Sequence, residues 1–254
     1  MPRVRKARAL PGERKDNVVH AYRELRRMIV WAELPPGSRI SERSIAERLG
    51  VSRTPVRSAM HRLEQEGFIL EAGGARHHQL IVAPLTANDG REIFLVVGHL
   101  EGLAARCAAS EPKEQRARIA KRMRAFNREL SREGRNGIDA VRFFELDTKL
   151  HECYVEGVAG PRVVALHRAI KPQAERYVRL YVSVLLGAVA VSVREHERIA
   201  EYIAKGDANA AQKAAESNWH NAAERLARVI ERQGELGSWR RAAPVTRGNG
   251  RSAR

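Results

Sequence analysis

Only two short segments of this 254-residue chain have the pattern of a β-strand, and both lie in its first third. They are residues 68–70 and 80–82, which flank the pair Gly73–Gly74 as the arms of a hairpin flank a turn. The other apolar segments between residues 17 and 233 repeat at the spacing of an amphipathic helix. The chain is therefore predicted to be mainly α-helical, with one small hairpin packed on helices.

Two short helices are predicted immediately before the hairpin. Ser41 can cap a helix that ends at Gly50, and Ser52 can cap a second helix that runs to about residue 66. A longer helix is expected over residues 17–31, ahead of a Pro-Pro-Gly break. Two helices joined by a tight turn and followed by a hairpin are typical of a winged helix-turn-helix. The N-terminal residues of the second helix of such a domain enter the major groove of DNA.

Polar and basic residues occupy the positions that such a domain turns toward DNA. Hydroxyls and the N–H groups at a helix start suit phosphate oxygens, and an arginine fork suits O6 and N7 of guanine. Glycines let a wing approach closely, and arginine is attracted to the potential of the minor groove. The candidate DNA-contacting residues are Arg43, Ser52, Arg53, Thr54, Arg57, Gly73, Gly74 and Arg76. The alternative is a solvated face on a winged helix that binds protein.

The formal net charge is +16, from 46 Lys and Arg against 30 Asp and Glu. Such an excess attracts a polyanion, for which nucleic acid is the first candidate, although basic residues also serve solubility. Residues 1–15 are expected to form a disordered basic arm, and residues 234–254 a disordered tail. We find no apolar run of membrane-spanning length and no secretion signal, so we expect the cytoplasm.

Three stretches within residues 17–83 resemble the GntR family of regulators. They read PGSRISE from Pro36, IAERLGVSRTPVR from Ile45 and RLEQEGFI from Arg62. The resemblance implies that the Gly73–Gly74 turn belongs to the wing. It also implies DNA contacts by Arg43, Ser52, Arg53, Thr54 and Arg57. Ser58 departs from the family, in which many members carry Glu, and we expect no loss of DNA binding from this difference.

A domain boundary is expected at residues 84–86, which separates a DNA-binding domain (16–85) from a helical domain (86–233). The second domain is predicted to be an antiparallel bundle of six helices, because glycine and proline breaks divide its helical pattern into six segments. These segments are 87–109, 112–133, 137–157, 161–186, 190–204 and 208–233.

One predicted helix of the second domain carries a carboxylate and an imidazole on its apolar stripe. Asp147 and His151 lie one turn apart there, and buried polar groups need partners. They can pair with each other or with arginine, or they can bind one divalent metal. His196 also points inward on its predicted helix, whereas the pattern leaves the direction of His220 open. One carboxylate and three imidazoles, if they converge, would fill most of a transition-metal shell.

The second half also resembles a known domain, the FCD domain typical of the FadR subfamily of GntR regulators, over residues 86–231. The resemblance rests on residues 100–101, 104–105, 144–151, 195–197, 206–207, 211 and 220. Six helices are similar to the VanR type of this domain. Many FCD domains hold a metal with an Asp-x3-His pair and two later histidines. This implies a divalent ion, such as zinc or nickel, bound by Asp147, His151, His196 and His220.

One departure bears on the effector. Many FCD domains carry an arginine four residues before the position of Glu101, where it helps to hold an acidic ligand, and this chain has Val97 there. Either the ligand is less acidic, or another side chain substitutes. The candidate pocket residues are His99, Arg106, Arg176 and Arg179.

The resemblance implies a transcription regulator, usually a repressor, and no enzymatic activity. The protein is expected to bind a palindromic DNA operator as a homodimer and to sense a small organic acid. A metal-dependent hydrolase is the alternative from another class, with Glu195 or Glu152 as its general base. A DNA-binding architectural protein without a ligand is a further alternative.

Overall fold

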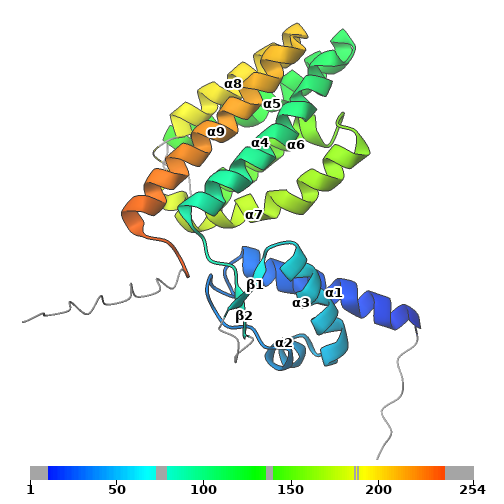
Figure 1. The fold of residues 1–254 in the computed structure, drawn as a ribbon. Helices are drawn as coiled ribbons and strands as arrows, with labels where there is room; N and C mark the ends of the chain where they lie inside the picture. The colour runs from blue at the N-terminus through cyan, green and yellow to red at the C-terminus, as the bar shows by residue number, and fades with distance from the viewer. Residues whose placement is uncertain (1–10, 73–78, 136–139, 186, 188, 238–254) are drawn as a thin grey trace, which may run out of the picture.

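The computed structural model describes residues 11–72, 79–135, 140–185, 187 and 189–237. Figure 1 shows an N-terminal body of helices α1 to α3 with strands β1 and β2, and a C-terminal body of helices α4 to α9. The N-terminal elements are α1 (Pro11–Val30), α2 (Glu42–Leu49), α3 (Arg53–Gln65), β1 (Ile69–Ala72) and β2 (Gln79–Val82). The C-terminal elements are α4 (Ala87–Ser110), α5 (Lys113–Arg135), α6 (Ala140–Val155), α7 (Pro161–Leu185), α8 (Val189–Lys205) and α9 (Ala208–Gln233). The mainly helical fold is confirmed.

Helices α2 and α3 with the hairpin form the predicted winged helix-turn-helix. The hydroxyl of Ser41 accepts a hydrogen bond from the backbone N–H of Ser44 at 3.1 Å, which caps α2. Gly50 ends α2 in the left-handed region, with a φ of 66°. Strands β1 and β2 are antiparallel, with Ile69 opposite Val82. Leu25, Val56, Leu63, Phe68 and other buried side chains fill the core beneath α3.

Helix α1 begins at Pro11, ahead of the predicted start at residue 17. Residues 11–15 are therefore helical, whereas we expected them to belong to a disordered arm. Proline suits the first position of a helix because its φ is already helical and its missing N–H would have no partner there. Residues 1–10 lie outside the described residues.

The C-terminal body is built around the pair α4 and α9, which lie side by side in Figure 1. Two glycines of α4 allow the close approach. A Cβ added at Gly98 would lie 2.7 Å from Cβ of Trp219, and one added at Gly102 would lie 2.8 Å from Cγ of Glu216. This packing brings the Trp219 ring against the buried face of α4.

Helix α4 is the only helix in the described part of the chain that is long and apolar enough to cross a membrane. More than half of its apolar window, 56%, is buried inside the protein, as in the core helix of a folded domain.

The C-terminal end of the described chain returns to the linker between the two bodies. The backbone N–H of Leu85 donates to the carbonyl of Leu236 at 2.8 Å, and the N–H of Leu236 donates to the carbonyl of Leu85 at 3.1 Å. Leu85 is fully buried, so its polar backbone groups need these partners. Residues 234–237 are therefore ordered against the linker, although they fall in the tail expected to be disordered. Residues 238–254 lie outside the described residues.

Candidate functional site

The start of α3 presents an exposed polar surface. Ser52 precedes the helix, and its hydroxyl makes no capping hydrogen bond, so it is free for another acceptor or donor. Ser52, Arg53, Thr54 and Arg57 are all exposed. Arg43 of α2 joins Ser52 and Arg53 around a shallow hollow between the two helices. The predicted residues of α2 and α3 thus lie on the outer side of the helix-turn-helix.

Two of these arginines are held by carboxylates in the DNA-free protein. Arg57 donates to both oxygens of Glu42, at 2.6 and 2.9 Å, and this hydrogen bonding lowers the pKa of Glu42. Arg43 donates to Glu47 at 2.9 Å. The side chains of Arg57 and Arg43 are 71% and 81% exposed, and ion pairs that water screens in this way contribute little to stability. A phosphate or a guanine edge can therefore replace the carboxylate at small cost.

The other candidate DNA-contacting residues belong to the predicted wing tip. Gly73, Gly74 and Arg76 lie outside the described residues.

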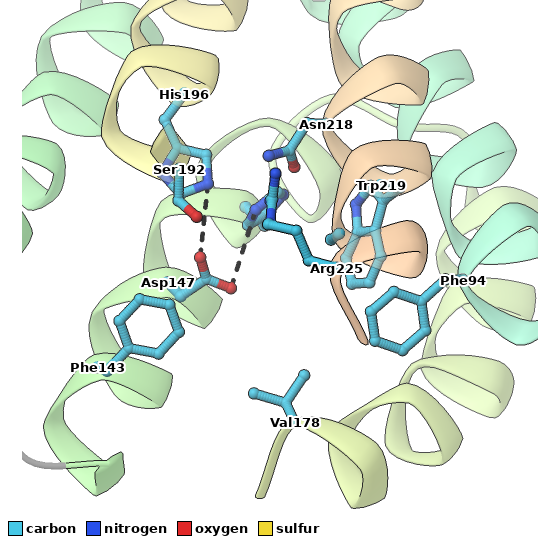
Figure 2. A pocket seen from close by; sticks show the side chains of 11 residues that line it. Phe94, Phe143, Asp147, Val178, Ser192, His196, Asn218, Trp219 and Arg225 are labelled. Carbon is cyan, nitrogen blue, oxygen red and sulfur yellow. Dashed lines mark ion pairs between the residues drawn. The ribbon is translucent and has the colours of Figure 1, made fainter. Parts of the chain in front are cut away.

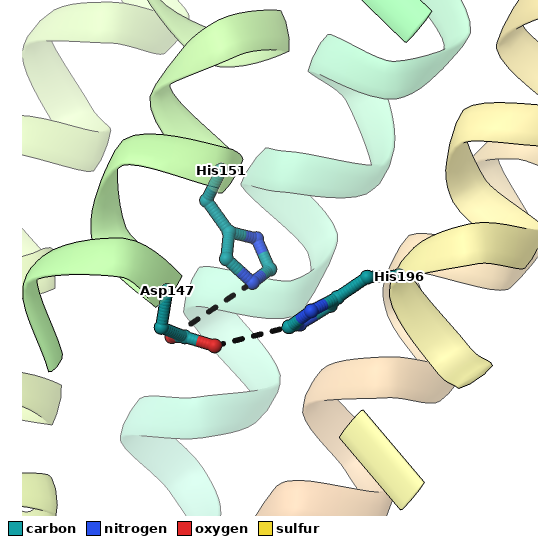
Figure 3. Close-up of side chains that lie close together, drawn as sticks. All are labelled: Asp147, His151 and His196. Atoms are coloured by element: carbon teal, nitrogen blue, oxygen red, sulfur yellow. Dashed lines mark ion pairs between the residues drawn. The ribbon is translucent and has the colours of Figure 1, made fainter. Parts of the chain in front are cut away.

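A second candidate site lies inside the C-terminal body, where α6 faces α8. Figure 3 shows Asp147 and His151 of α6 together with His196 of α8. Nε2 of His196 lies 3.4 Å from Oδ1 of Asp147, and Nε2 of His151 lies 4.0 Å from Oδ2 of the same carboxylate. One candidate ligand atom from each residue lies within 4.8 Å of the other two. The structure thus brings three of the four predicted metal ligands together.

His196 lacks satisfactory hydrogen-bond partners. Its side chain is buried, Nδ1 has no partner, and 3.4 Å from Nε2 to Asp147 is longer than a normal N–H···O bond. Burial lowers the pKa of His196 to about 4, so the ring is neutral at pH 7. A neutral imidazole whose Nε2 faces a carboxylate without a normal hydrogen bond fits a metal ligand, because a bound cation would interact with both Nε2 and the carboxylate.

A fully buried carboxylate, Glu101 of α4, orients the neighbouring His151. Nδ1 of His151 lies 2.5 Å from Oε2 of Glu101, and the same oxygen accepts from Tyr154 at 2.6 Å and Trp219 at 2.9 Å. Because a carboxylate accepts only, Nδ1 carries the hydrogen and Nε2 keeps its lone pair on the side of Asp147. This carboxylate–imidazole arrangement is typical behind metal ligands.

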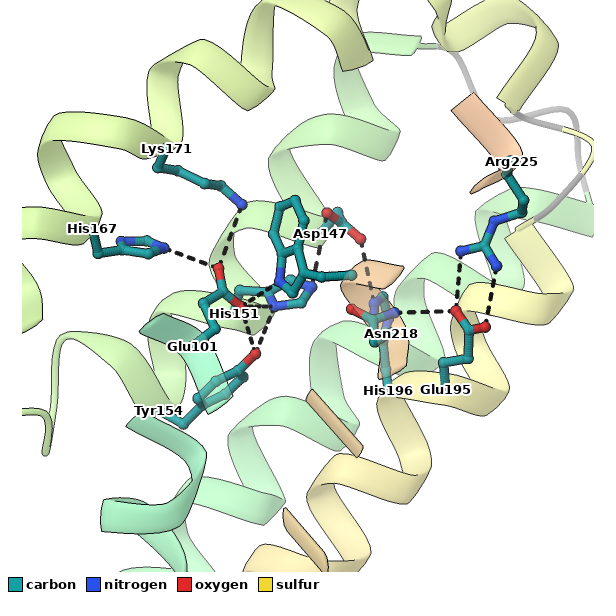
Figure 4. Close-up of polar contacts among 11 residues, drawn as sticks. Glu101, Asp147, His151, Tyr154, His167, Lys171, Glu195, His196, Asn218 and Arg225 are labelled. Atoms are coloured by element: carbon teal, nitrogen blue, oxygen red, sulfur yellow. Dashed lines mark hydrogen bonds and ion pairs between the residues drawn. The ribbon is translucent and has the colours of Figure 1, made fainter. Parts of the chain in front are cut away.

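The other oxygen of Glu101 faces α7. It lies 2.9 Å from Nε2 of His167 and 3.7 Å from Nζ of Lys171, as Figure 4 shows. Burial alone would raise the pKa of Glu101. The electrostatic interactions with His151 and Lys171 and the hydrogen bonds from His151 and His167 outweigh burial and hold the pKa of Glu101 well below its usual range. Glu101 is thus an ionised anchor that links α4, α6 and α7.

A cavity of about 60 Å³ adjoins the cluster. Figure 2 shows its lining, which has an apolar and a polar part. The apolar part is formed by Phe94, Phe143, Val178, Trp219 and Ala222, and the polar part by Asp147, His151, Ser192, His196, Asn218 and Arg225. Space of this size holds a few water molecules or a small polar ligand.

The structure does not place the fourth predicted ligand, His220, with the other three. His220 is exposed, whereas Asn218 of the same helix is buried and lines the cavity. Positions 218 and 220 are two residues apart and therefore about 200° apart around the helix, so α9 cannot turn both of them inward. The amide nitrogen of Asn218 donates to Glu195 at 3.1 Å, and its oxygen is therefore turned away from Glu195.

The chain matches two known families. Residues 17–76 match the profile of bacterial regulatory proteins of the gntR family, and residues 92–221 match the FCD domain, which alone spans half of the chain. The chain belongs to the GntR family. It is a transcriptional regulator with a DNA-binding domain and an FCD domain, as the sequence analysis predicted.

Relatives of this GntR-family regulator carry similar descriptions. It is 28% identical to the HTH-type transcriptional regulator YdhC of Bacillus subtilis over 210 residues, which are 83% of this chain and 91% of YdhC. It is 32% identical to the Nta operon transcriptional regulator of Aminobacter aminovorans over 124 residues, 49% of this chain and 55% of that protein. The solved structure of E. coli McbR/YncC has the same fold, with a TM-score of 0.63 at 15% identity over 84% of this chain and 97% of that one.

The expected effector residues of this GntR-family member lie away from the cavity. His99 and Arg106 are exposed on α4 and contact α9 through Glu216 and Asn209. Arg176 and Arg179 are on the face of α7 toward the N-terminal body, and neither lines the cavity. Arg225 of α9, which sequence reasoning did not select, is the arginine among the lining residues.

The hydrolase alternative is wrong, because the two matched families and the relatives identify a transcriptional regulator. The geometry agrees. Both oxygens of Glu195 are held by Arg225, at 3.1 and 3.0 Å, and Asn221 also donates to it. Glu152 lines a different hollow, between α6 and α7. Neither carboxylate is placed as a general base beside Asp147.

Proposed function

We propose that this regulator is a repressor of the FadR subfamily, with a six-helix FCD domain of the VanR type, that acts in the cytoplasm. It binds a palindromic operator as a dimer and releases it when a small organic acid enters a metal-containing pocket. The observation that carries the sensing role is the convergence of Asp147, His151 and His196 beside a cavity, with His151 oriented by Glu101.

The residues around the cavity provide a donor set for one divalent ion. Asp147 offers a carboxylate oxygen, and His151 and His196 offer imidazole nitrogens. The amide oxygen of Asn218, turned away from Glu195, is the proposed fourth donor in place of His220. Two imidazoles and a carboxylate suit zinc or nickel. The ion, when bound, supplies an open coordination position for an oxygen of the effector.

The cavity favours a small anionic effector. Its volume of about 60 Å³ restricts the part that enters to a few non-hydrogen atoms. Bound metal would offset the negative charge of Asp147, while Ser192 and Arg225 provide donors for a carboxylate. The apolar wall that includes Phe94, Phe143 and Val178 suits a short hydrocarbon portion.

An exposed apolar stripe on α4 supports the dimer. Leu95, Val96 and Leu103 are 42–43% exposed and lie on the outer face of the helix with His99. Their spacing of about two helical turns suits pairing with the same helix of a second copy. Two copies would present two α3 helices to the two halves of a palindrome.

Metal analysis and thermal-shift screening test the sensing role. Protein purified without chelator should carry about one divalent ion per chain, and His196→Ala should lose it. His220→Ala is the matched control, because this exposed histidine of α9 should leave the metal content unchanged. A screen of small carboxylic acids should raise the melting temperature only without chelator. Equal metal content in all three proteins, or hits that are indifferent to chelator, would contradict the proposal.

A further inference from the structure

Helix α7 has two faces that serve different parts of the protein. On one face, Tyr177 and Tyr181 are buried in the core and Val178 lines the metal cavity. Gln173 and Arg176 lie on the adjoining side of the helix, toward the N-terminal body. Figure 1 shows α7 between the other C-terminal helices and the helix-turn-helix. One helix therefore contacts both the cavity and the N-terminal body, which carries the helix-turn-helix.

Gln173 and Arg176 bind the backbone of the N-terminal body, hereafter the reading body (α1 to α3 with β1 and β2), where the chain enters and leaves the hairpin. Nε2 of Gln173 donates to the carbonyl of Glu66 at 2.6 Å, and Glu66 is the residue that ends α3. Nη2 of Arg176 donates to the carbonyl of Ala83, directly after β2, at 2.6 Å. Arg176 also donates to the side-chain oxygen of Gln173 at 3.1 Å, so each side chain holds the other. Both ends of the hairpin are thereby tied to one turn of α7.

These contacts give orientation at little net gain in free energy. Arg176 is 1% exposed and forms no ion pair with a carboxylate within the described ranges, and its Nε has no partner. Burial lowers its pKa to about 10, so it stays charged at neutral pH. A buried guanidinium whose donors are only partly used pays a desolvation cost that water would relieve if the bodies separated. Gln173 and Arg176 therefore fix the orientation of the N-terminal body relative to α7 more than they stabilise the contact between them.

A third side chain of α7 adds to the contacts of Gln173 and Arg176, and the three together are called the joint. The guanidinium of Arg179 lies 3.8 Å from the ring centroid of Trp31, just after α1, and 4.2 Å from that of Phe144. Phe144 belongs to α6, the helix that carries Asp147 and His151. The joint thus contacts the helix of the metal cluster as well as the reading body.

We infer that Gln173 and Arg176 are positioning residues for DNA recognition. They set the angle at which α3 meets its half-site, and they add nothing to the general attraction between the protein and DNA. That attraction depends on surface charge, whereas fit to two half-sites depends on the orientation of both reading bodies. The inference rests on the proposed two-headed binding to a palindrome.

The test compares two duplexes of equal length: one selected from a random pool by the wild-type protein, and one of unrelated sequence. Full-length Gln173→Ala/Arg176→Ala should bind the selected duplex at least about tenfold more weakly and the unrelated duplex within about twofold of wild type. Arg162→Ala, an exposed arginine at the start of α7, is the control and should change neither affinity. Zinc titration by calorimetry should give the wild-type affinity in all three proteins.

An unchanged affinity for the selected duplex would overturn the inference, and so would an equal loss on both duplexes. If the double variant loses helicity, Gln173→Met replaces it, because it nearly keeps the side-chain volume while it removes both the donor to Glu66 and the acceptor for Arg176. A wild-type protein that does not bind zinc would contradict the proposed metal pocket. The ratio of the affinities for the two duplexes would still decide the role of Gln173 and Arg176.

Discussion

His151 and Glu101 lie on different helices, yet Nδ1 of the imidazole is 2.5 Å from Oε2 of the carboxylate. Their contact decides which nitrogen of His151 faces the cavity, because the hydrogen on Nδ1 is committed to a fully buried acceptor. Glu101 of α4 thus determines which nitrogen of His151, on α6, is available to a ligand in the cavity.

Glu101→Gln should weaken metal binding about 10–100-fold, the usual effect of losing a hydrogen-bond partner behind a metal ligand. The amide removes the charge and offers His151 a donor in place of one acceptor oxygen. Competition of zinc with a chelating dye measures the affinity. Glu216→Gln is the control, since Glu216 contacts the exposed His99 and not the cluster. Equal zinc affinity in the Glu101 variant and wild type would refute the orienting role.

Arg53→Ala should cost about 1–3 kcal/mol of specific DNA binding, as expected for an arginine that reads a base. Fluorescence anisotropy with the selected duplex measures the affinity. Arg118→Ala removes the same charge from an exposed position on α5, far from the helix-turn-helix in sequence, and should have little effect. The assignment of α3 as the reading helix fails if both variants bind alike.

Metal-free protein should lose stability as the pH falls from about 6.5 toward about 4. The folded state lowers the pKa of His196 from 6.5 to about 4, so the unfolded chain binds more protons in this range. The stability associated with the neutral ring is fully present above about pH 6.5 and is lost by about pH 4, a change of roughly 3 kcal/mol. Urea unfolding with chelator at several pH values measures it. His196→Asn should flatten this part of the profile, and an unchanged profile would speak against a buried, neutral ring.

Leu103→Glu should convert the proposed dimer to monomer, because a carboxylate would enter the apolar stripe of α4 without a partner. Light scattering after size exclusion measures the mass. Leu166→Glu is the matched control, since Leu166 is 59% exposed on α7, outside the stripe. A dimer that survives the change at Leu103 would place the contact between copies elsewhere.

The helix-turn-helix could be predicted closely because its determinants are local. Ser41 and Gly50 mark the ends of α2, and the alternation of exposed and buried residues in α3 follows from spacing alone. The start of α1 was predicted too late, because the charged residues after Pro11 carry no apolar pattern although they continue the helix.

The candidate metal site could be predicted only where its residues share a helix or an evident apolar face. Asp147 and His151 are one turn apart, and His196 follows the apolar pattern of α8. The direction of His220 was not predictable, because alanines surround it on several sides of α9 and the packing of Trp219 on Gly98 sets the rotation of that helix. The role of Glu101 could not be predicted, because its partners come from three other helices, α6, α7 and α9. Its position within the buried stripe of α4 is the signal that could have identified it.

The backbone pairing of Leu85 with Leu236 holds the last described residues against the linker between the two bodies. A chain shortened to Gln233 would retain the helices α1 to α9 but leave the backbone N–H and carbonyl of Leu85 without their partner, Leu236. A change at the C-terminal end of the described chain, such as an affinity tag fused directly after Leu236, would therefore act on the linker between the N-terminal and C-terminal bodies.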